Sequence, residues 1–164
     1  MKTSFSVSTS KGDILRVGMS VADEYFLSPE ICSLLSDLNI EIIEVSLERM
    51  VGNAKIGIGT LLKVSEIIAN FLMENENGIL FYYCDDLLDI PMSNHQILPQ
   101  EYRNALFSDL FDLYQKHHNI KGLHDMSIKI NAIDRPLFMH FIARDSHIHI
   151  LEKIAYDMKI SYSK

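Results

Sequence analysis

The chain begins with two short stretches in which hydrophobic and polar residues alternate. Phe5 and Val7 stand between serines, and beyond Lys11-Gly12-Asp13 the hydrophobic positions from Leu15 to Val21 fall on every second residue. A period of two places one set of side chains on a single face of a β-strand. The two stretches therefore predict a β-hairpin with a tight turn between them.

Four later segments repeat their hydrophobic residues every three or four positions, which is typical of amphipathic helices. These helices are predicted over residues 28–39, 60–73 and 99–118, and from residue 145 towards the C-terminus. Ser28, followed by Pro29, is a helix-start signal, and Thr60 is expected to cap the second helix. Asp145 or Ser146 is expected to cap the last helix.

Four further strands are predicted, at Ile40–Leu47, Ile79–Cys84, Met126–Ala132 and Leu137–Ala143. Ile79–Cys84 is hydrophobic throughout, as expected of a central strand that is covered on both faces. The last two strands flank a turn at Asp134-Arg135-Pro136 and should form a second hairpin. The element order is ββαβαβαββα, which predicts a single α+β domain over residues 1–164 with a mixed β-sheet covered by helices.

The composition agrees with a folded domain, because 48% of the 164 residues are hydrophobic and 23% are charged. The net charge of −7, with scattered lysines and arginines, argues against a nucleic-acid-binding surface. No hydrophobic run approaches the roughly 18 residues of a membrane span, and the N-terminus lacks the apolar core of a signal peptide. We therefore expect a cytoplasmic protein without membrane contact, in which Cys32 and Cys84 are free thiols.

A glycine-rich segment, Lys55-Ile56-Gly57-Ile58-Gly59-Thr60, precedes the second helix. Glycines at a helix start let backbone N–H groups approach a phosphate, and the helix dipole favours the negative charge there. The segment resembles the pyrophosphate-binding segment of the GNAT acetyltransferase superfamily, in which a glycine-rich turn after a central strand opens a helix and cradles acetyl-coenzyme A. The resemblance implies that Gly57, Ile58, Gly59 and Thr60 bind this cofactor. The alternative is a plain structural turn, since a short motif needs structural context.

Two positions depart from the GNAT pattern. Ala54 stands three residues before Gly57, where the family usually has arginine or glutamine. Asp85-Asp86 and a long loop follow the next strand, where the family has a characteristic asparagine. No general base is indicated by the residues that carry the resemblance.

Asp85, Asp86 and Asp89 form an acidic cluster after the strand Ile79–Cys84, at the strand end where α/β sheets commonly bind ligands. Such carboxylates can hold Mg²⁺ or act in acid–base chemistry, but a solvent-facing acidic cluster is the commoner structure. Asp85–Leu98 is also the longest irregular segment, which is typical of a functional loop or an insertion.

The histidines offer a possible zinc site together with Asp125, but their spacing matches no known metal motif, so no metal is predicted. The histidines considered are His117, His118, His124, His140, His147 and His149. Helix-end histidines such as His117 and His118 also interact favourably with the helix dipole. Motifs of serine hydrolases and of P-loop nucleotidases are absent from the sequence.

Further features stand along the chain: the N-terminal hairpin, Asn53-Ala54-Lys55-Ile56 before Thr60, Tyr83-Cys84-Asp85, and Arg103-Asn104-Ala105-Leu106-Phe107. On the basis of these features, most of the chain resembles a family of small, functionally uncharacterised proteins from Bacteroidota. The resemblance implies a shared fold and no established activity. The short acidic-glycine-basic turn of that family is replaced here by residues 87–98.

Two hypotheses about function follow from the sequence. The first is a non-catalytic protein-interaction module, of an immunity, antitoxin or defence type, that needs no cofactor and binds a protein partner through Asp85, Asp86, Asp89 and the loop to Leu98. It rests on small size, acidity and the lack of a strong catalytic motif. The second is a GNAT-like acyltransferase that binds acetyl-coenzyme A at Gly57–Thr60.

Overall fold

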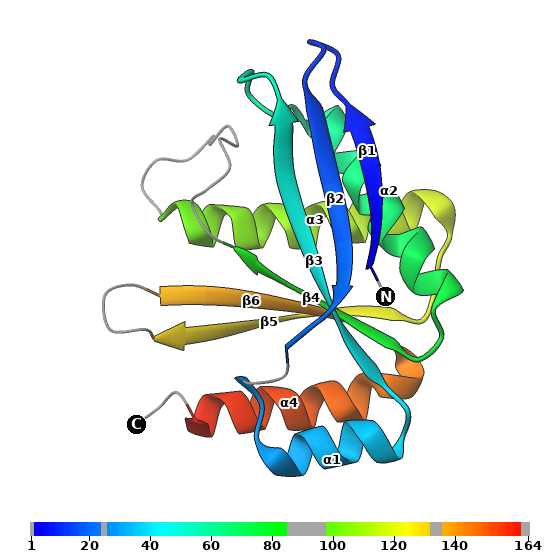
Figure 1. Ribbon diagram of the computed structural model, residues 1–164, viewed down its shortest axis with the longest axis vertical. Helices are drawn as coiled ribbons and strands as arrows, with labels where there is room; N and C mark the ends of the chain where they lie inside the picture. The colour runs from blue at the N-terminus through cyan, green and yellow to red at the C-terminus, as the bar shows by residue number, and fades with distance from the viewer. Residues whose placement is uncertain (1, 24–25, 85–97, 132–135, 162–164) are drawn as a thin grey trace.

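A six-stranded β-sheet forms the centre of the molecule in a computed structural model that describes residues 2–23, 26–84, 98–131 and 136–161 (Figure 1). The strand order across the sheet is β1-β2-β3-β4-β6-β5. The strands are β1 (Lys2–Ser8), β2 (Ile14–Val21), β3 (Glu41–Val51), β4 (Gly78–Cys84), β5 (Leu123–Asn131) and β6 (Pro136–Arg144). Only β3 and β4 pair in parallel, and all other neighbours are antiparallel.

Two helices cover each face of this sheet, as Figure 1 shows. The helices are α1 (Pro29–Asp37), α2 (Ile58–Glu74), α3 (Pro99–His118) and α4 (Ile148–Ser161). Helices α1 and α4 lie on one face, whereas α2 and α3 lie on the other. None of the helices in the described ranges is long and apolar enough to span a membrane.

The predicted α+β fold is confirmed, including the order of the ten strands and helices and the mixed sheet between helices. The helix over 99–118 has the expected bounds, and Ser28 caps α1 by accepting a hydrogen bond from the N–H of Ile31. The last two strands pair as the predicted hairpin. β4 lies inside the sheet with strands on both sides, as its hydrophobic sequence indicated.

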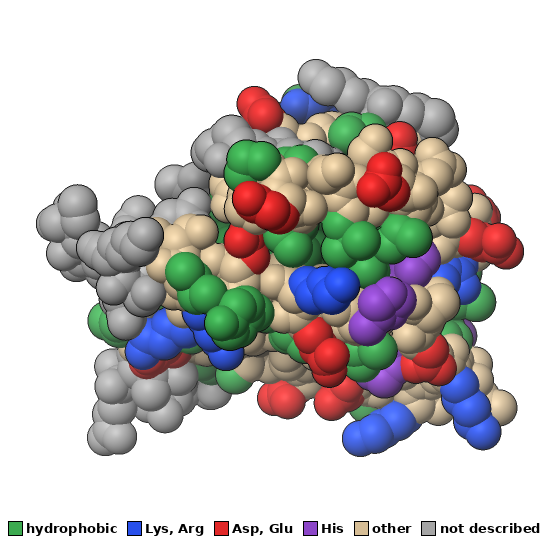
Figure 2. Space-filling view, turned by 90° about the horizontal axis from the view of Figure 1, so that it is seen from below, with side chains coloured by type: hydrophobic (Ala, Val, Ile, Leu, Met, Phe, Trp, Pro, Cys, Tyr) green, Lys and Arg blue, Asp and Glu red, His purple; other side chains and the backbone are tan. Residues whose placement is uncertain are grey.

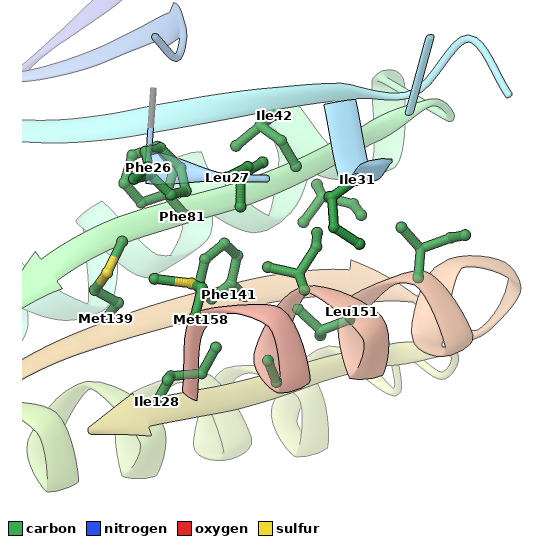
Figure 3. Close-up of a cluster of buried hydrophobic side chains, with 14 of the residues drawn as sticks. Phe26, Leu27, Ile31, Ile42, Phe81, Ile128, Met139, Phe141, Leu151 and Met158 are labelled. Carbon is green, nitrogen blue, oxygen red and sulfur yellow. The ribbon is translucent and has the colours of Figure 1, made fainter. Parts of the chain in front are cut away.

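The core beneath α1 and α4 is built around stacked aromatic rings (Figure 3). The ring centroid of Phe81 lies 5.1 Å from that of Phe26 and 5.8 Å from that of Phe141. Leu151 and Met158 of α4 are fully buried against this group. Aromatic contacts of this kind add to the free energy that burial of the rings already supplies.

A second core lies beneath α2 and α3, and β3 contributes to both cores. Ile42 packs in the core under α1 and α4, whereas Ile43 packs in the core under α2 and α3. Two consecutive isoleucines can both be buried because adjacent side chains of a strand point to opposite faces of the sheet. The break in alternation at this point of the sequence therefore marks a strand that is covered on both sides.

Several predicted boundaries are wrong. β5 begins at Leu123 and not at Met126, and Pro136, which was predicted in a turn, is the first residue of β6. Thr60 does not cap α2, since the N-cap is Gly57 and Thr60 is buried inside the first turn. Asp145 and Ser146 form a 3₁₀ turn (Asp145–His147) before α4 begins at Ile148. β3 continues beyond Leu47 to Val51, because its polar second half still pairs with β2.

The C-terminal end of α2 is capped by a side chain from the sheet. Nη2 of Arg144, at the end of β6, donates hydrogen bonds to the carbonyl oxygens of Leu72 (2.7 Å) and Met73 (2.6 Å). The last turn of α2 contains no basic residue of its own. Arg144 therefore adds hydrogen bonds to the last turn of α2, where the Leu72 carbonyl also accepts from the N–H of the C-cap residue Asn75 (3.3 Å), and places a positive charge at the negative end of the helix dipole.

We predict that Arg144→Met lowers the free energy of unfolding by about 1–2 kcal/mol, because charge-assisted hydrogen bonds to the end of α2 are lost while the aliphatic bulk is kept. Urea denaturation measures the change. Lys153→Met, at an exposed position of α4, is the control and should change the midpoint little. Equal midpoints for the two variants would contradict the capping role.

Candidate functional site

The two parallel strands at the centre of the sheet diverge after a short shared stretch. β3 and β4 pair only from Glu41 and Gly78 to Glu44 and Phe81. Beyond this point β3 continues alongside β2, whereas β4 continues alongside β6. Figure 1 shows β3 rising to the top of the molecule while β4 heads to the left. The carboxyl ends of parallel strands, where α/β sheets commonly bind ligands, thus separate around an opening.

A cavity of about 260 Å³ lies at this divergence. Its walls come from β3 and β4, from α2 through Val64 and Ile68, and from α3 through Phe107 and Phe111. Most of the lining is apolar, with a small number of polar groups among the hydrophobic side chains. This combination is typical of small-molecule and cofactor sites. The space can hold an elongated, mainly apolar chemical group.

Glu44 and Glu48 of β3 and Arg103 of α3 supply the charged groups of the cleft. Glu44 is half-buried and occupies the last paired position before β3 and β4 separate. Glu48 forms an ion pair with Arg16 on β2, so its charge is already compensated. Arg103 is buried and is the cation that lines this cavity. Glu44 is therefore the carboxylate best placed for acid–base chemistry.

Tyr82 of β4 contributes a phenol to the same cavity. Its ring stacks on the imidazole of His140 with centroids 4.9 Å apart, and Phe107 contacts it edge-on at 5.5 Å. Burial raises the pKa of Tyr82 well above 10, and the nearby Asp125 carboxylate and Cys84 thiol raise it further. The phenol therefore stays protonated around neutral pH, where it can donate a hydrogen bond.

Behind Tyr82, a network of polar side chains joins α3 to β5 and β6. Nδ1 of the fully buried His140 lies 2.7 Å from Oδ1 of Asp125, and its Nε2 contacts Oδ1 of Asn104. The hydroxyl of Ser127 donates to Asn104 (2.6 Å), and that of Ser108 donates to Asp125. The imidazole is thus held between the side chains of Asp125 and Asn104. The network fixes the ring on which Tyr82 stacks.

The glycine segment lies at the start of α2 and is open. Gly57 and Gly59 are exposed, and a Cβ atom added to either would meet no atom within 4 Å. The N-cap residue Gly57 has no side chain to accept from the N–H groups of the first turn. Gly59 precedes the cavity residue Ser65 by six positions, which is about 9 Å along a helix. Residues 57–60 are not among the residues that line the cavity, so the open helix start and the cavity are linked through α2 and not by direct contact.

The side chains that the sequence offers as possible metal ligands are not gathered into one site among the described residues. Asp85, Asp86 and Asp89 lie outside the described ranges, as does the loop to residue 97. Across residues 2–23, 26–84, 98–131 and 136–161, no group of three or more His, Cys, Asp or Glu side chains could hold a metal ion. His124 pairs with Asp145, whereas His140 pairs with Asp125. On the surface around α1 and α4, histidines lie among acidic, basic and hydrophobic side chains (Figure 2).

The cleft residues Glu44, Tyr82 and Arg103 were not candidates from the sequence. Glu44 follows the irregular Ile42-Ile43 pair, which was the only local sign that β3 is unusual. Arg103 occurs in an amphipathic helix, where an arginine normally indicates an exposed position. Their proximity depends on how α3 crosses β4, and no local pattern encodes that crossing.

We predict that Asp125→Asn lowers the free energy of unfolding by about 1–3 kcal/mol, because it weakens the hydrogen bonds between this carboxylate and the buried His140 ring and Ser108 hydroxyl. Asp112→Asn, at an exposed carboxylate of α3, serves as the control. Both variants are compared by urea denaturation at neutral pH. A stability loss no larger than that of the control would show that the network does not hold α3 against the sheet.

Comparison of the chain with protein-family models, with curated proteins and with solved structures gives no match in any of the three.

Proposed function

We propose that this protein is a GNAT-like acyltransferase that binds an acyl-coenzyme A in the cleft between β3 and β4. The observation that carries the proposal is the divergence of these parallel strands around a mainly apolar cavity, which α2 links to its open glycine start. A plain structural turn needs no cleft, whereas exposed glycines leave the N–H groups of the helix start open to a ligand. Both features together favour the ligand-binding interpretation of Gly57–Thr60.

The donor set at α2 fits the phosphate end of such a ligand. The first turn of an α-helix presents N–H groups without partners inside the helix, and its dipole favours an anion. The first turn of α2 contains no acidic residue, and the exposed Lys55 stands two residues before Gly57. The cavity, which begins about two helical turns further along α2, fits the mainly apolar arm and acyl group.

Residues of the cleft supply the acid and base that acyl transfer requires. Acyl-coenzyme A provides an activated thioester when it is bound. Glu44 would take the proton of the attacking amine or hydroxyl and return it to the departing thiolate, to which the protonated Tyr82 would donate a hydrogen bond. Deprotonation of the acceptor and protonation of the thiolate keep the net charge of the cleft unchanged over one reaction.

The interaction-module hypothesis depends on Asp85, Asp86, Asp89 and the loop to Leu98, and residues 85–97 have no described geometry. The contacts, cavity and charges of the described residues bear on the acyltransferase hypothesis, which is the one that we propose. The cofactor that follows from this choice is acyl-coenzyme A.

We predict that coenzyme A raises the melting temperature of the wild-type protein, since a ligand at 100 times its Kd adds about 2.7 kcal/mol of stability. Gly59→Asp should abolish this shift, because the new carboxylate repels phosphate, yet it should not destabilise the protein, because an acidic residue is favourable at a helix start. Gly59→Asn, which adds the same bulk without the charge, is the matched control. A shift of wild-type size in Gly59→Asp would contradict phosphate binding at α2.

We further predict that Glu44→Gln reduces kcat by about 10²–10⁴-fold with little change in KM for acetyl-coenzyme A, because it removes the proton acceptor and keeps the shape of the side chain. Thiol release from acetyl-coenzyme A in the presence of a panel of primary amines provides the assay. Glu41→Gln, on the exposed part of the same strand before the divergence, is the control. Equal activities of the two variants would exclude Glu44 as the base.

A further inference from the structure

One carboxylate fastens the loop between β3 and α2, residues 52–57, to the β1–β2 hairpin. Oδ2 of the buried Asp13 accepts hydrogen bonds from Nη1 of Arg49 (2.6 Å) and from the backbone N–H of Ala54 (2.9 Å). Arg49 lies near the end of β3, and Ala54 lies within the loop. Asp13 thus joins three segments through charge-assisted hydrogen bonds, which are stronger than those between neutral groups.

The position of Asp13 is itself fixed by the hairpin turn. Oγ1 of Thr9 accepts hydrogen bonds from the N–H groups of Lys11 (3.2 Å) and Asp13 (3.1 Å). The N–H of Thr9 donates to the carbonyl oxygen of Asp13 at 2.9 Å. The hydrogen bonds of the hairpin turn therefore fix the backbone of Asp13.

The loop also passes so close to Asp13 that only glycine fits at one position. Gly52 has a φ of +89°, which side chains other than glycine rarely adopt, and a Cβ atom there would overlap Oδ1 of Asp13. Backbone contact at Gly52 and a hydrogen bond at Ala54 hold both ends of a three-residue stretch. Three residues later the chain reaches Gly57, the N-cap of α2.

We propose that Asp13 is a positioning residue for phosphate binding, which it supports by holding the loop that leads into Gly57 and the first turn of α2. The inference rests on the proposed function, because it assigns to Asp13 an effect on the phosphate end of coenzyme A and none on its pantetheine arm. A purely structural role would instead weaken all ligands equally or lower stability alone. Phosphate selectivity is therefore the property that distinguishes the two roles.

The test compares wild-type protein, Asp13→Ala and Asp13→Asn. We expect Asp13→Ala to weaken binding of coenzyme A about tenfold in calorimetry, the size of losing one charge-assisted hydrogen bond, with unchanged binding of pantetheine, which lacks the phosphates. Asp13→Asn should recover most of the affinity, since its amide oxygen can still accept from the N–H of Ala54. Hydrogen exchange of residues 54–59 without ligand should be faster in Asp13→Ala and close to normal in Asp13→Asn.

Asp157→Ala is the matched control, because Oδ2 of Asp157 accepts from the N–H of Ser28 (3.0 Å) in an equivalent carboxylate–amide contact between α4 and the start of α1. It should change neither loop exchange nor coenzyme A affinity. If Asp13→Ala does not fold, Gly52→Ala takes its place, since the added methyl group displaces the same carboxylate.

The outcomes separate the two proposals. Wild-type protein that binds no coenzyme A overturns the proposed function together with this inference. Wild-type binding with equal losses for coenzyme A and pantetheine in Asp13→Ala, or with unchanged exchange of residues 54–59, overturns the inference alone. Selective loss of coenzyme A affinity with faster loop exchange supports both.

Discussion

The structure depends on how two antiparallel groups of strands are joined at the centre of the sheet. Each of the central strands β3 and β4 pairs with its antiparallel neighbour over a longer stretch than with the other. β1, β2 and β3 form one ladder, and β4, β6 and β5 form the other. They meet only through the four residue pairs between β3 and β4, and parallel neighbours of this kind need a long crossover, which α2 supplies. Past Glu44 each strand follows its own antiparallel partner, so the sheet opens there. The cleft is the direct result of this arrangement, and both α2 and α3 contribute to its walls.

Much of the fold could be predicted from the sequence, because its signals are local. The Ser28-Pro29 start of α1, the three-and-four spacing in α3 and the hydrophobic run of β4 each specify one element. The end of β3 was missed because residues 48–51 are partly polar and owe their strand conformation to pairing with β2. The predicted N-cap of α2 was displaced by three residues, since Thr60 resembles a cap although its side chain is buried in the first turn and the cap is Gly57.

The candidate site was only half predictable. The glycines at the start of α2 have a local signature, whereas the cleft depends on contacts between residues far apart in the chain. β5 illustrates the difficulty: Asp125 and Ser127 alternate with hydrophobic residues as on a solvent-facing strand, yet they bind polar side chains of α3. A polar face that is covered by another polar face has the same sequence pattern as one covered by water.

The cap at the C-terminal end of α2 has an electrostatic consequence at the opposite end of the helix. Arg144 supplies a positive charge where the carbonyl dipoles converge, so the negative pole of α2 is neutralised. The positive pole at Gly57 has neither an acidic residue in its first turn nor a side-chain cap. The helix therefore acts as a one-sided source of positive potential in a chain whose net charge is −7. An anion approaching this acidic protein therefore meets a local attraction at the start of α2.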